Sequence, residues 1–559
     1  MKNHTEITMK VRAALFILPV MLMMLQGCRN AATELPAGKT ESRVATGNGG
    51  QMADDNVAEI LAATSNRTAP GQFGVRGFHV DLRIQVMTMK ALRELADELA
   101  QFGINTLVME WEASYPYRNN ATISRELAYT RDEVASFIDY CEERGIDVIP
   151  LQQCFGHVEY ILRHDRYSEL KEDRKDISQL CPLKEEADSL LFADLFTDMA
   201  SMHQSDYIHI GGDETYLLGH CPACSLKAAT EGKSKLFVDY MKMMCDIIIS
   251  LGKKPVMWAD ILLKYPEAAA EMPVETIFID WNYGWKTNYF GDITALQEKG
   301  LEFWGSPAIR SHPDNAWVTC WEKHFNNQRD FIPYAREAGY TGIVMTSWST
   351  SGVYGFTWDV NYEVVEMEQI RNTYPLSGFR ILIASYVQAL NQPEPIDPHK
   401  FVVHYAVDRF GLTEAEGELL WETLTIAPEL IVNGRPANSP SIRAMRDTVA
   451  AAVAKMKILK ASKNIDEFEH LRLMLDLRDH YLAFKEVESR FNSPDFSIDD
   501  RESIVPELEP LIRDSRKLDK RFARLNKGFL YDTEIAEQNM IRNRKLMLLH
   551  ERLTGKRIR

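Results

Sequence analysis

Two adjacent carboxylates, Asp213 and Glu214, follow a short apolar run and two glycines in residues 208–215, IHIGGDET. Consecutive residues of a regular strand face opposite sides, so both side chains can reach one site only if the strand ends near Gly212. Glycine permits such a bend and allows a substrate or a neighbouring backbone to approach closely. The pair is therefore suited to acid–base chemistry.

Two other kinds of site use similar residues. A phosphate-binding loop would need Gly-Lys-Ser or Gly-Lys-Thr after the glycine-rich turn, and this stretch lacks it. A metal centre could use His209, Asp213, Glu214 and His220, but their spacing contains no HExxH pattern. We therefore predict a site without a metal ion and without a cofactor.

Eight short apolar runs alternate with amphipathic stretches between about residue 74 and residue 390. Residues 89–102, for example, place Leu92, Leu95 and Leu99 at helical spacing. Strands that alternate with helices in this way predict an α/β fold, a (β/α)8 TIM barrel, over residues 71–392. The expected strands are 77–82, 106–110, 147–151, 207–211, 255–258, 276–281, 302–305 and 342–348.

Polar, charged and aromatic residues gather where these runs end. In a (β/α)8 barrel the carboxyl ends of the strands form the catalytic mouth. Carboxylates there can bind sugar hydroxyls or transfer protons, and aromatic rings can stack on sugar rings, so the pattern predicts a carbohydrate site. Besides the two carboxylates, the residues expected at the mouth are Asp81, Arg83, Glu110, Trp111, Glu112, Gln152, Gln153, Gly156, His157, Trp258, Asp260, Asp280, Trp281, Tyr283, Trp304 and Trp348.

The stretch IHIGGDET resembles the signature of family 20 glycoside hydrolases, the β-N-acetylhexosaminidases. Residues 76–83, RGFHVDLR, are similar to the first strand of that family, and residues 148–157, VIPLQQCFGH, to its third. Residues 255–260, PVMWAD, resemble its fifth strand. The segments EWE, FGHVE and TSW, at 110–112, 155–159 and 346–348, look closest to the hexosaminidase D branch.

The resemblance implies hydrolysis with retention, in which the substrate's own 2-acetamido oxygen attacks the anomeric carbon. Glu214 would be the general acid that protonates the leaving oxygen and then the base that activates water. Asp213 would orient the acetamido group and stabilise its developing positive charge. A neighbouring carboxylate should raise the pKa of Glu214, which favours the acid role.

The same resemblance implies an aromatic pocket for the acetamido group. Trp258, Trp304 and Trp348 would form its walls, and Tyr283 would bond the acetamido carbonyl. Ordinary packing inside the barrel is the alternative for each tryptophan, because barrel interiors are filled by bulky side chains. Asp280 and Trp281 are also expected to contact substrate.

Three polar residues receive roles by resemblance as well. Arg76 would hold the ring hydroxyls far from the scissile bond, a task that suits the guanidinium fork. His157 and Glu110 would support the catalytic pair, with a purely structural role as the alternative for His157.

The chain departs from the family pattern at two strand ends. Ala259 precedes Asp260 where a carboxylate pair is common, and Ser349 and Thr350 stand where many relatives have a glutamate that contacts the outer hydroxyls. The choice between N-acetylglucosamine and N-acetylgalactosamine therefore stays open, although the hexosaminidase D likeness favours galactosaminides.

The first 28 residues have the organisation of a lipoprotein signal peptide. Lys10 and Arg12 supply positive charge, an apolar run follows, and LQGC at 25–28 looks like a bacterial lipobox with Cys28 as the lipidated residue. An uncleaved anchor is the alternative, although the run is short for a membrane span. Either way we expect an exported protein in the periplasm or at the outer membrane. Residues 29–70 are expected to be a flexible tether.

Seven cysteines remain if Cys28 is lipidated, which gives no paired disulfide framework. Cys221 and Cys224 form a lone CxxC. Alone it is a weak indication of zinc, because a structural zinc site needs four ligands, and Cys181 or His220 could complete one only if the fold brought them there. We expect a local disulfide or plain packing.

Residues 393–559 differ in character from the barrel region. Long charged amphipathic stretches, as at 441–462 and 465–486, predict an α-helical C-terminal domain. It could support the barrel, shape the mouth or mediate a homodimer. The formal net charge of -16 over 559 residues argues against a nucleic-acid partner, because phosphate binding needs a basic face.

Three functions are compatible with these patterns. The first is an exported, lipid-anchored exo-β-N-acetylhexosaminidase that acts on glycans with a terminal β-linked N-acetylhexosamine. The second is a retaining glycosidase of another specificity, in which Glu110 or Glu112 would lie about 5 Å from Glu214. The third is a glycan-binding lipoprotein without turnover, against which the intact carboxylate pair argues.

Overall fold

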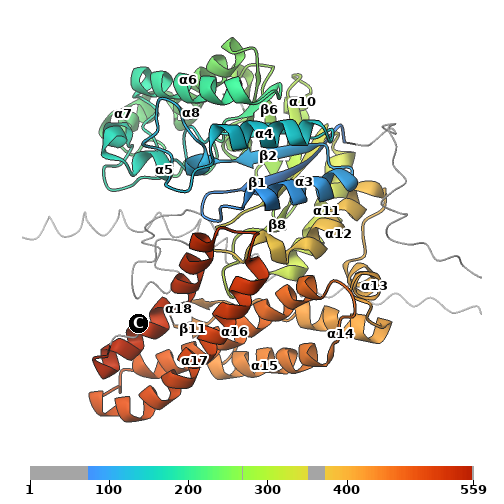
Figure 1. Ribbon diagram of the computed structural model, residues 1–559. Helices are drawn as coiled ribbons and strands as arrows, with labels where there is room; N and C mark the ends of the chain where they lie inside the picture. Colours follow the sequence, from blue (N-terminus) through green and yellow to red (C-terminus); the bar gives the residue numbers. More distant parts are fainter. Residues whose placement is uncertain (1–72, 267, 351–371, 433, 557–559) are drawn as a thin grey trace, which may run out of the picture.

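The computed structural model describes residues 73–266, 268–350, 372–432 and 434–556. Eight parallel strands close into a barrel surrounded by helices, and a helical region lies against one side of it (Figure 1). Both features agree with the sequence prediction. The barrel closes where β1 pairs with β9, with Val75 opposite Gly342.

Each predicted strand is present, with its ends within two residues of the predicted ones. The barrel strands are β1 (Val75–Asp81), β2 (Thr106–Glu110), β3 (Asp147–Leu151), β4 (Tyr207–His209), β5 (Lys254–Trp258), β6 (Ile277–Trp281), β7 (Glu302–Ser306) and β9 (Gly342–Ser347). A short ninth strand, β8 (Ala308–Arg310), pairs with the outer part of β9 and was not predicted.

Amphipathic helices cover the outside of the barrel. In α3 the residues Leu92, Leu95 and Leu99 are buried, as their spacing predicts, and the Thr88 side chain caps the helix by accepting from Ala91 N. The helices of the barrel region are α3 (Met89–Gln101), α4 (Arg131–Glu142), α5 (Glu159–Leu162), α6 (Glu185–Met202), α7 (Pro222–Glu231), α8 (Lys233–Ser250), α9 (Asp260–Lys264), α10 (Thr294–Gln297), α11 (Trp321–Glu337) and α12 (Arg380–Asn391).

The strands bury both of their faces. One set of alternate side chains forms a core inside the barrel, which includes Val108, Ile149 and Val344. The other set, which includes Phe78 and Phe278, packs against the helices. Because side chains alternate along a strand, this division decides which residues of each strand can reach the mouth.

The C-terminal region consists of long helices, with two short strands, β10 (Ile431–Val432) and β11 (Arg435–Pro436), among them. It contacts the barrel through the loops that follow β1 and β2: Glu534 pairs with Arg125 at 2.6 Å, and Thr88 donates to Gly528 O. This region therefore supports two loops of the barrel mouth (Figure 1). Its helices are α13 (Pro398–Phe410), α14 (Glu414–Leu424), α15 (Ile442–Ile458), α16 (Ile465–Phe491), α17 (Arg501–Asn526) and α18 (Asp532–Thr554).

The expected signal peptide, the lipidated Cys28 and the tether at 29–70 lie outside the described residues. Among the helices that are described, none has the length and apolar character needed to cross a bilayer.

Candidate active site

Asp213 and Glu214, hereafter the acid pair, lie at the rim of the barrel beyond β4. The strand ends two residues before Gly211, and Gly211 and Gly212 adopt φ values of 73° and 93° in the left-handed region. A Cβ added at Gly211 would lie 1.8 Å from Oε1 of Gln153. The two glycines are therefore required by the bend and by the close approach of the neighbouring loop.

His157, from the loop after β3, joins both members of the acid pair. Its Nε2 lies 3.3 Å from Oδ2 of Asp213 and 3.3 Å from Oε2 of Glu214. The other oxygen of Glu214, Oε1, accepts a hydrogen bond of 2.7 Å from the Tyr216 hydroxyl. Both oxygens of Glu214 are thus held by side chains, which fixes the direction of the carboxyl group.

The charges of this group shift its protonation. Burial disfavours the charged imidazole, but Asp213 and Glu214 outweigh it and hold the pKa of His157 well above its usual range. Burial alone would raise the pKa of Glu214, but the hydrogen bond and charge of His157 lower it below its usual value. The expectation that Asp213 raises the pKa of Glu214 is therefore wrong for the free enzyme, because an imidazolium lies between the two carboxylates.

Two more buried carboxyl groups surround the acid pair. Asp260, at the start of α9, accepts from Glu214 N at 3.4 Å, and burial together with the charge of Asp213 raises the pKa of Asp260 to about 7. Burial likewise raises the pKa of Glu159 to about 7, against the opposing charge of His157. The site therefore contains carboxyl groups of different proton affinity within one small volume.

Three residues at this rim adopt left-handed backbone conformations without being glycine. They are Glu112, His157 and Glu214, with φ of 43°, 54° and 49°, and they follow the neighbouring strands β2, β3 and β4. Such conformations are uncommon outside glycine and are concentrated at functional sites. The strain supports the assignment of this edge of the barrel as the active site.

Aromatic side chains lie beside the acid pair. Trp348 donates from Nε1 to the Tyr283 hydroxyl at 3.0 Å, and its ring centroid is 5.9 Å from that of Trp258. Trp281 packs 5.0 Å from Tyr283. Burial, and in addition the charges of the acid pair, raise the pKa of the Tyr283 phenol. These four rings form one aromatic cluster at the ends of β5, β6 and β9.

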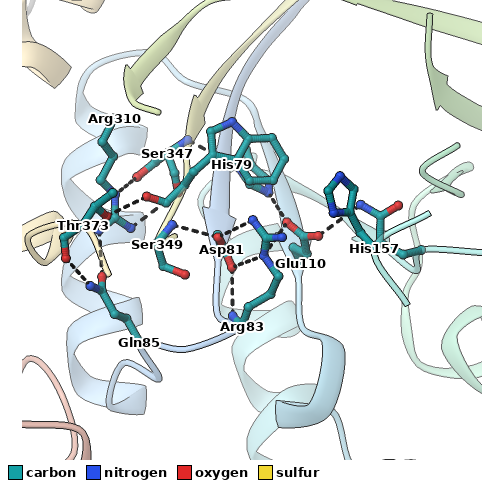
Figure 2. A network of polar contacts seen from close by, with 12 residues as sticks. His79, Asp81, Arg83, Gln85, Glu110, His157, Arg310, Ser347, Ser349 and Thr373 are labelled. Carbon is teal, nitrogen blue, oxygen red and sulfur yellow. Dashed lines mark hydrogen bonds and ion pairs between the residues drawn. The ribbon is translucent and has the colours of Figure 1, made fainter. Parts of the chain in front are cut away.

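A buried polar network links the ends of β1, β2 and β9 (Figure 2). Asp81 accepts two side-chain hydrogen bonds from Arg83 and one from Ser349 N. Glu110 lies 3.0 Å from His79 Nε2 and accepts from Gln153 Nε2 at 3.2 Å. Glu110 therefore reaches the acid pair indirectly, through the glutamine that lies against Gly211.

Arg310 was not foreseen at the site, although it extends this network. It is fully buried at the end of β8 and donates to Ser347 Oγ, to Gln85 Oε1 and to Tyr374 O. Burial lowers its pKa to about 10. Arg310 stabilises the strand end that carries Trp348, and no local sequence signal distinguishes it from an exposed arginine.

Three predicted substrate contacts are corrected by the structure. Arg76 is the second residue of β1, at the end of the strand away from the mouth, and its guanidinium donates to Asn391 Oδ1 at the end of α12. Asp280 faces outward from β6 and accepts from Tyr340 at 2.7 Å, a residue packed against α11. In both cases strand alternation directs the side chain toward the helices rather than into the barrel.

Trp304 is the third correction. Its ring is fully buried inside the barrel, 5.4 Å from Tyr207, and its Nε1 donates to Glu302. Tyr207 and Glu302 begin their strands, and a Cβ added at Gly342, the first residue of β9, would lie 2.7 Å from the Trp304 ring. Trp304 therefore closes the end of the barrel opposite the mouth, which was the alternative reading for it.

The cysteines of the CxxC pair lie apart from the acid pair. None of the seven described cysteines forms a disulfide, so the first of the two outcomes expected for the CxxC pair is not met. Cys221 and Cys224 are joined by Cys181 and by Glu172, and these four side chains could together hold a metal ion. His220 instead pairs with Asp173 at 3.2 Å.

Comparison with known proteins places the barrel in a family. Residues 73–327 match the model described as Glycosyl hydrolase family 20, catalytic domain. Hexosaminidase D of Bos taurus is 26% identical over 290 residues, which covers 49% of this chain and 84% of that protein. Hexosaminidase D of Homo sapiens is 26% identical over 295 residues, which covers 49% and 60%.

The solved structure of a β-N-acetylhexosaminidase is similar over 61% of this chain and 78% of the solved chain, with a TM-score of 0.45 and 18% sequence identity. The family match begins two residues before β1 and includes the acid pair, His157, Trp258 and Tyr283. Residues 73–327 of the barrel thus match the catalytic domain of glycosyl hydrolase family 20, which indicates a glycoside hydrolase.

Proposed function

We propose that the chain is an exo-β-N-acetylhexosaminidase that removes terminal N-acetylgalactosamine or N-acetylglucosamine from glycans, with the substrate's acetamido group as the nucleophile. The observation that carries the proposal is the acid pair itself, with His157 at 3.3 Å from both carboxylates and an aromatic cluster beside it. Relatives in the same family carry the name hexosaminidase.

The unpartnered polar atoms at the site suit an amide ligand. Among the described residues, Asp213 Oδ1, Trp258 Nε1 and Asp260 Oδ1 are buried without a hydrogen-bond partner. Buried polar groups in native proteins normally have partners, so these atoms are candidates for contact with a substrate. An acetamido N–H can donate to Asp213 Oδ1, and Trp258 Nε1 and the Tyr283 hydroxyl can donate to polar groups of the substrate.

In the first step the acetamido oxygen attacks the anomeric carbon while Glu214 gives a proton to the leaving oxygen. Asp213 accepts the acetamido N–H and stabilises the positive charge of the oxazolinium ion. In the second step Glu214 takes a proton from water, which opens the oxazolinium ring with net retention. No protein carboxylate forms a bond to the sugar.

His157 supplies the proton for the first step. The pKa of His157 is raised and that of Glu214 is lowered, so in the free enzyme the shared proton lies on the imidazole. Its Nε2 is 3.3 Å from the Oε2 of Glu214, close enough for transfer along one hydrogen bond. As substrate excludes water and the leaving oxygen gains negative charge, Glu214 passes that proton on.

Hydrolysis of nitrophenyl glycosides tests the proposal against its rivals. The proposal predicts turnover of the β-N-acetylglucosaminide or β-N-acetylgalactosaminide and none of the plain β-glucoside. Turnover of the plain glucoside would support a retaining glycosidase with an enzyme nucleophile. Binding of the N-acetylated sugars without release would support a glycan-binding protein. The ratio of kcat/KM for the two N-acetylated substrates gives the specificity.

Glu214→Gln tests the role of the general acid. We expect a loss of about 10²–10⁴-fold in kcat/KM with a poor leaving group such as an alkyl alcohol. The loss should be much smaller with dinitrophenol, which leaves without protonation. Equal losses with both leaving groups would show that Glu214 does not protonate the leaving oxygen.

We further propose that the enzyme is an exported lipoprotein anchored through Cys28. The support is the sequence of residues 1–28, and the test is fractionation of cells that produce the wild type or Cys28→Ala. The wild type should remain with the membrane fraction, whereas the variant should not carry a lipid label. We also propose that the C-terminal helices mediate a homodimer, which light scattering of the purified chain tests.

A further inference from the structure

Four side chains with metal-binding atoms meet outside the acid pair. Glu172 and Cys181 lie at the two ends of a small hairpin in the loop between β3 and α6, where Lys171 bridges to Leu180. Cys221 is the N-cap of α7, and Cys224 lies in its first turn. The hairpin and the helix belong to successive loops of the barrel, so the cluster joins two separate segments.

The distances in the cluster match tetrahedral coordination. Cys181 Sγ lies 3.9 Å from Cys221 Sγ and 3.6 Å from Cys224 Sγ, and Cys224 Sγ lies 3.3 Å from Glu172 Oε2. In a tetrahedral zinc site with Zn–S bonds of about 2.3 Å, two sulfur atoms are about 3.8 Å apart and a sulfur and a carboxylate oxygen about 3.6 Å. A disulfide would need two sulfur atoms about 2.05 Å apart.

Backbone amides already orient the ligands. The second oxygen of Glu172, Oε1, accepts from His220 N and from Cys221 N, each at 2.7 Å, which leaves Oε2 facing the thiols. The amide of Cys224 donates to Cys221 Sγ at 3.4 Å. Such contacts from outside the ligand set hold ligands in place and offset negative charge on thiolates. The N-terminus of α7 adds a further positive potential.

We propose that Glu172, Cys181, Cys221 and Cys224 bind one structural zinc ion. Three sulfur ligands and one carboxylate leave no open position, as in structural rather than catalytic zinc sites. Three of the four side chains are buried and Cys221 is half-buried, so the ion would be enclosed by protein. Sulfur-rich tetrahedral sites favour zinc over magnesium or calcium.

The ion would fix the two loops that carry the catalytic residues. The segment after β3 that contains Glu172 and Cys181 also carries His157, and the segment after β4 that ends at Cys221 carries the acid pair. Between these points Gln179 Oε1 accepts from Leu217 N at 2.8 Å, next to Tyr216, which holds Glu214. Zinc at this position would therefore limit movement of His157 relative to Glu214, without contact to substrate.

Metal content and cobalt spectroscopy test the site independently of activity. The chain is produced without a polyhistidine tag, and metals are measured by plasma mass spectrometry. We expect one zinc ion per chain. After removal of zinc by a chelator, Co²⁺ should restore the site with the intense visible bands of tetrahedral cobalt and the charge-transfer bands of Co–thiolate bonds.

Matched variants locate the ion. Cys181→Ser and Glu172→Gln should lose zinc to a chelator much faster than the wild type. Cys245→Ser is the control, because Cys245 is a buried thiol that accepts from Thr276 in the core. This variant should keep one zinc ion. Zinc content and Co²⁺ binding should also be measured in the wild-type chain. A variant that fails to fold then does not decide the result.

Three results would overturn the proposal. The first is a wild-type chain with a disulfide among Cys181, Cys221 and Cys224, shown by mass spectrometry without reduction. The second is a set of free thiols that takes up neither Zn²⁺ nor Co²⁺ at one equivalent. The third is zinc that stays at one per chain in both Cys181→Ser and Glu172→Gln. None of these depends on hydrolysis, so failure of the proposed function leaves the zinc site to be judged separately.

Discussion

Replacement of His157 by asparagine removes the imidazolium that Asp213 and Glu214 share. At 3.3 Å and an effective dielectric constant of about 20, the attraction for each pair is about 5 kcal/mol before the cost of burial is deducted. Removal of one partner from a buried charge pair costs about 3–5 kcal/mol. Since the acid pair acts only when it is held in place, we expect kcat/KM to fall by about 10²–10³-fold.

The pH profile of His157→Asn supplies a second readout with a definite sign. His157 lowers the pKa of Glu214, so its removal should raise that pKa. In the wild type the proton that Glu214 delivers is held on His157, so activity is lost as the pH rises through the raised pKa of His157. In the variant Glu214 itself must hold that proton, and a carboxylate binds a proton less tightly than an imidazole does. The basic limb of kcat/KM should therefore move to lower pH in the variant.

The assay is kcat/KM for a nitrophenyl β-N-acetylhexosaminide from about pH 4 to about pH 9. His399→Asn is the matched control, because it removes an exposed histidine–glutamate pair of 2.6 Å between α13 and α14, away from the rim. The control should keep the wild-type rate and profile. A His157→Asn enzyme with the wild-type rate, or with its basic limb unmoved, would refute the reasoning.

Three further predictions follow from single side chains. Burial raises the pKa of Glu159 from 4.5 to about 7, so the folded state binds a proton at Glu159 more tightly than the unfolded state does. The stability that comes from this protonation is fully present below about pH 4.5 and is lost as the pH rises through about 7. The free energy of unfolding of Glu159→Gln, relative to that of the wild type, should therefore rise by up to about 3 kcal/mol between pH 4.5 and pH 8. Urea denaturation at the two pH values measures this difference. An equal difference at both pH values would show that Glu159 is not buried in this way. Gly212→Ala places a Cβ at φ of 93° and within 2.8 Å of Met241 Cε, so it should lower the free energy of unfolding by about 1–3 kcal/mol and remove most of the activity. Gly145→Ala is the control. Gly145 has φ of 71° with no atom within 4 Å of an added Cβ, so this variant should show the backbone cost alone. Trp348→Phe removes the hydrogen-bond donor to Tyr283 and should lower kcat/KM about tenfold or more. Trp304→Phe should leave KM unchanged, because Trp304 lies at the far end of the barrel. A raised KM for Trp304→Phe would show that Trp304 does line the substrate pocket.

The strands and the acid pair were predictable because their signals are local. An apolar run marks a strand, and two glycines before two carboxylates mark a bend at its end, so the mouth could be assigned from order along the chain alone. His157 could be assigned by resemblance, and its contact with both carboxylates follows from the neighbouring positions of β3 and β4.

The errors have a common physical cause. Arg76 and Asp280 lie on the outward face of their strands, and Trp304 lies inside the barrel but at its closed end. Which face and which level a strand residue occupies depends on register, and register is fixed by pairing with strands distant in the sequence. Sequence position near a strand end did not provide that information.

The partners of the acid pair that were missed also depend on distant contacts. Tyr216 reaches back to Glu214 because the loop after it is held by Gln179, from another loop. Likewise Cys181 meets the CxxC pair only because the hairpin between β3 and α6 folds against α7. A spacing rule applied to one segment cannot find ligands that another segment contributes.

The most direct test of the central claim is the effect of fluorination of the substrate's N-acetyl group on kcat/KM. Substitution of hydrogen by fluorine weakens the acetamido oxygen as a nucleophile and leaves the leaving group unchanged. If that oxygen attacks the anomeric carbon while Asp213 and Glu214 assist, the rate should fall steeply from acetyl to mono-, di- and trifluoroacetyl. A rate that does not depend on fluorination would contradict the account, because some other group would then form the bond to the sugar.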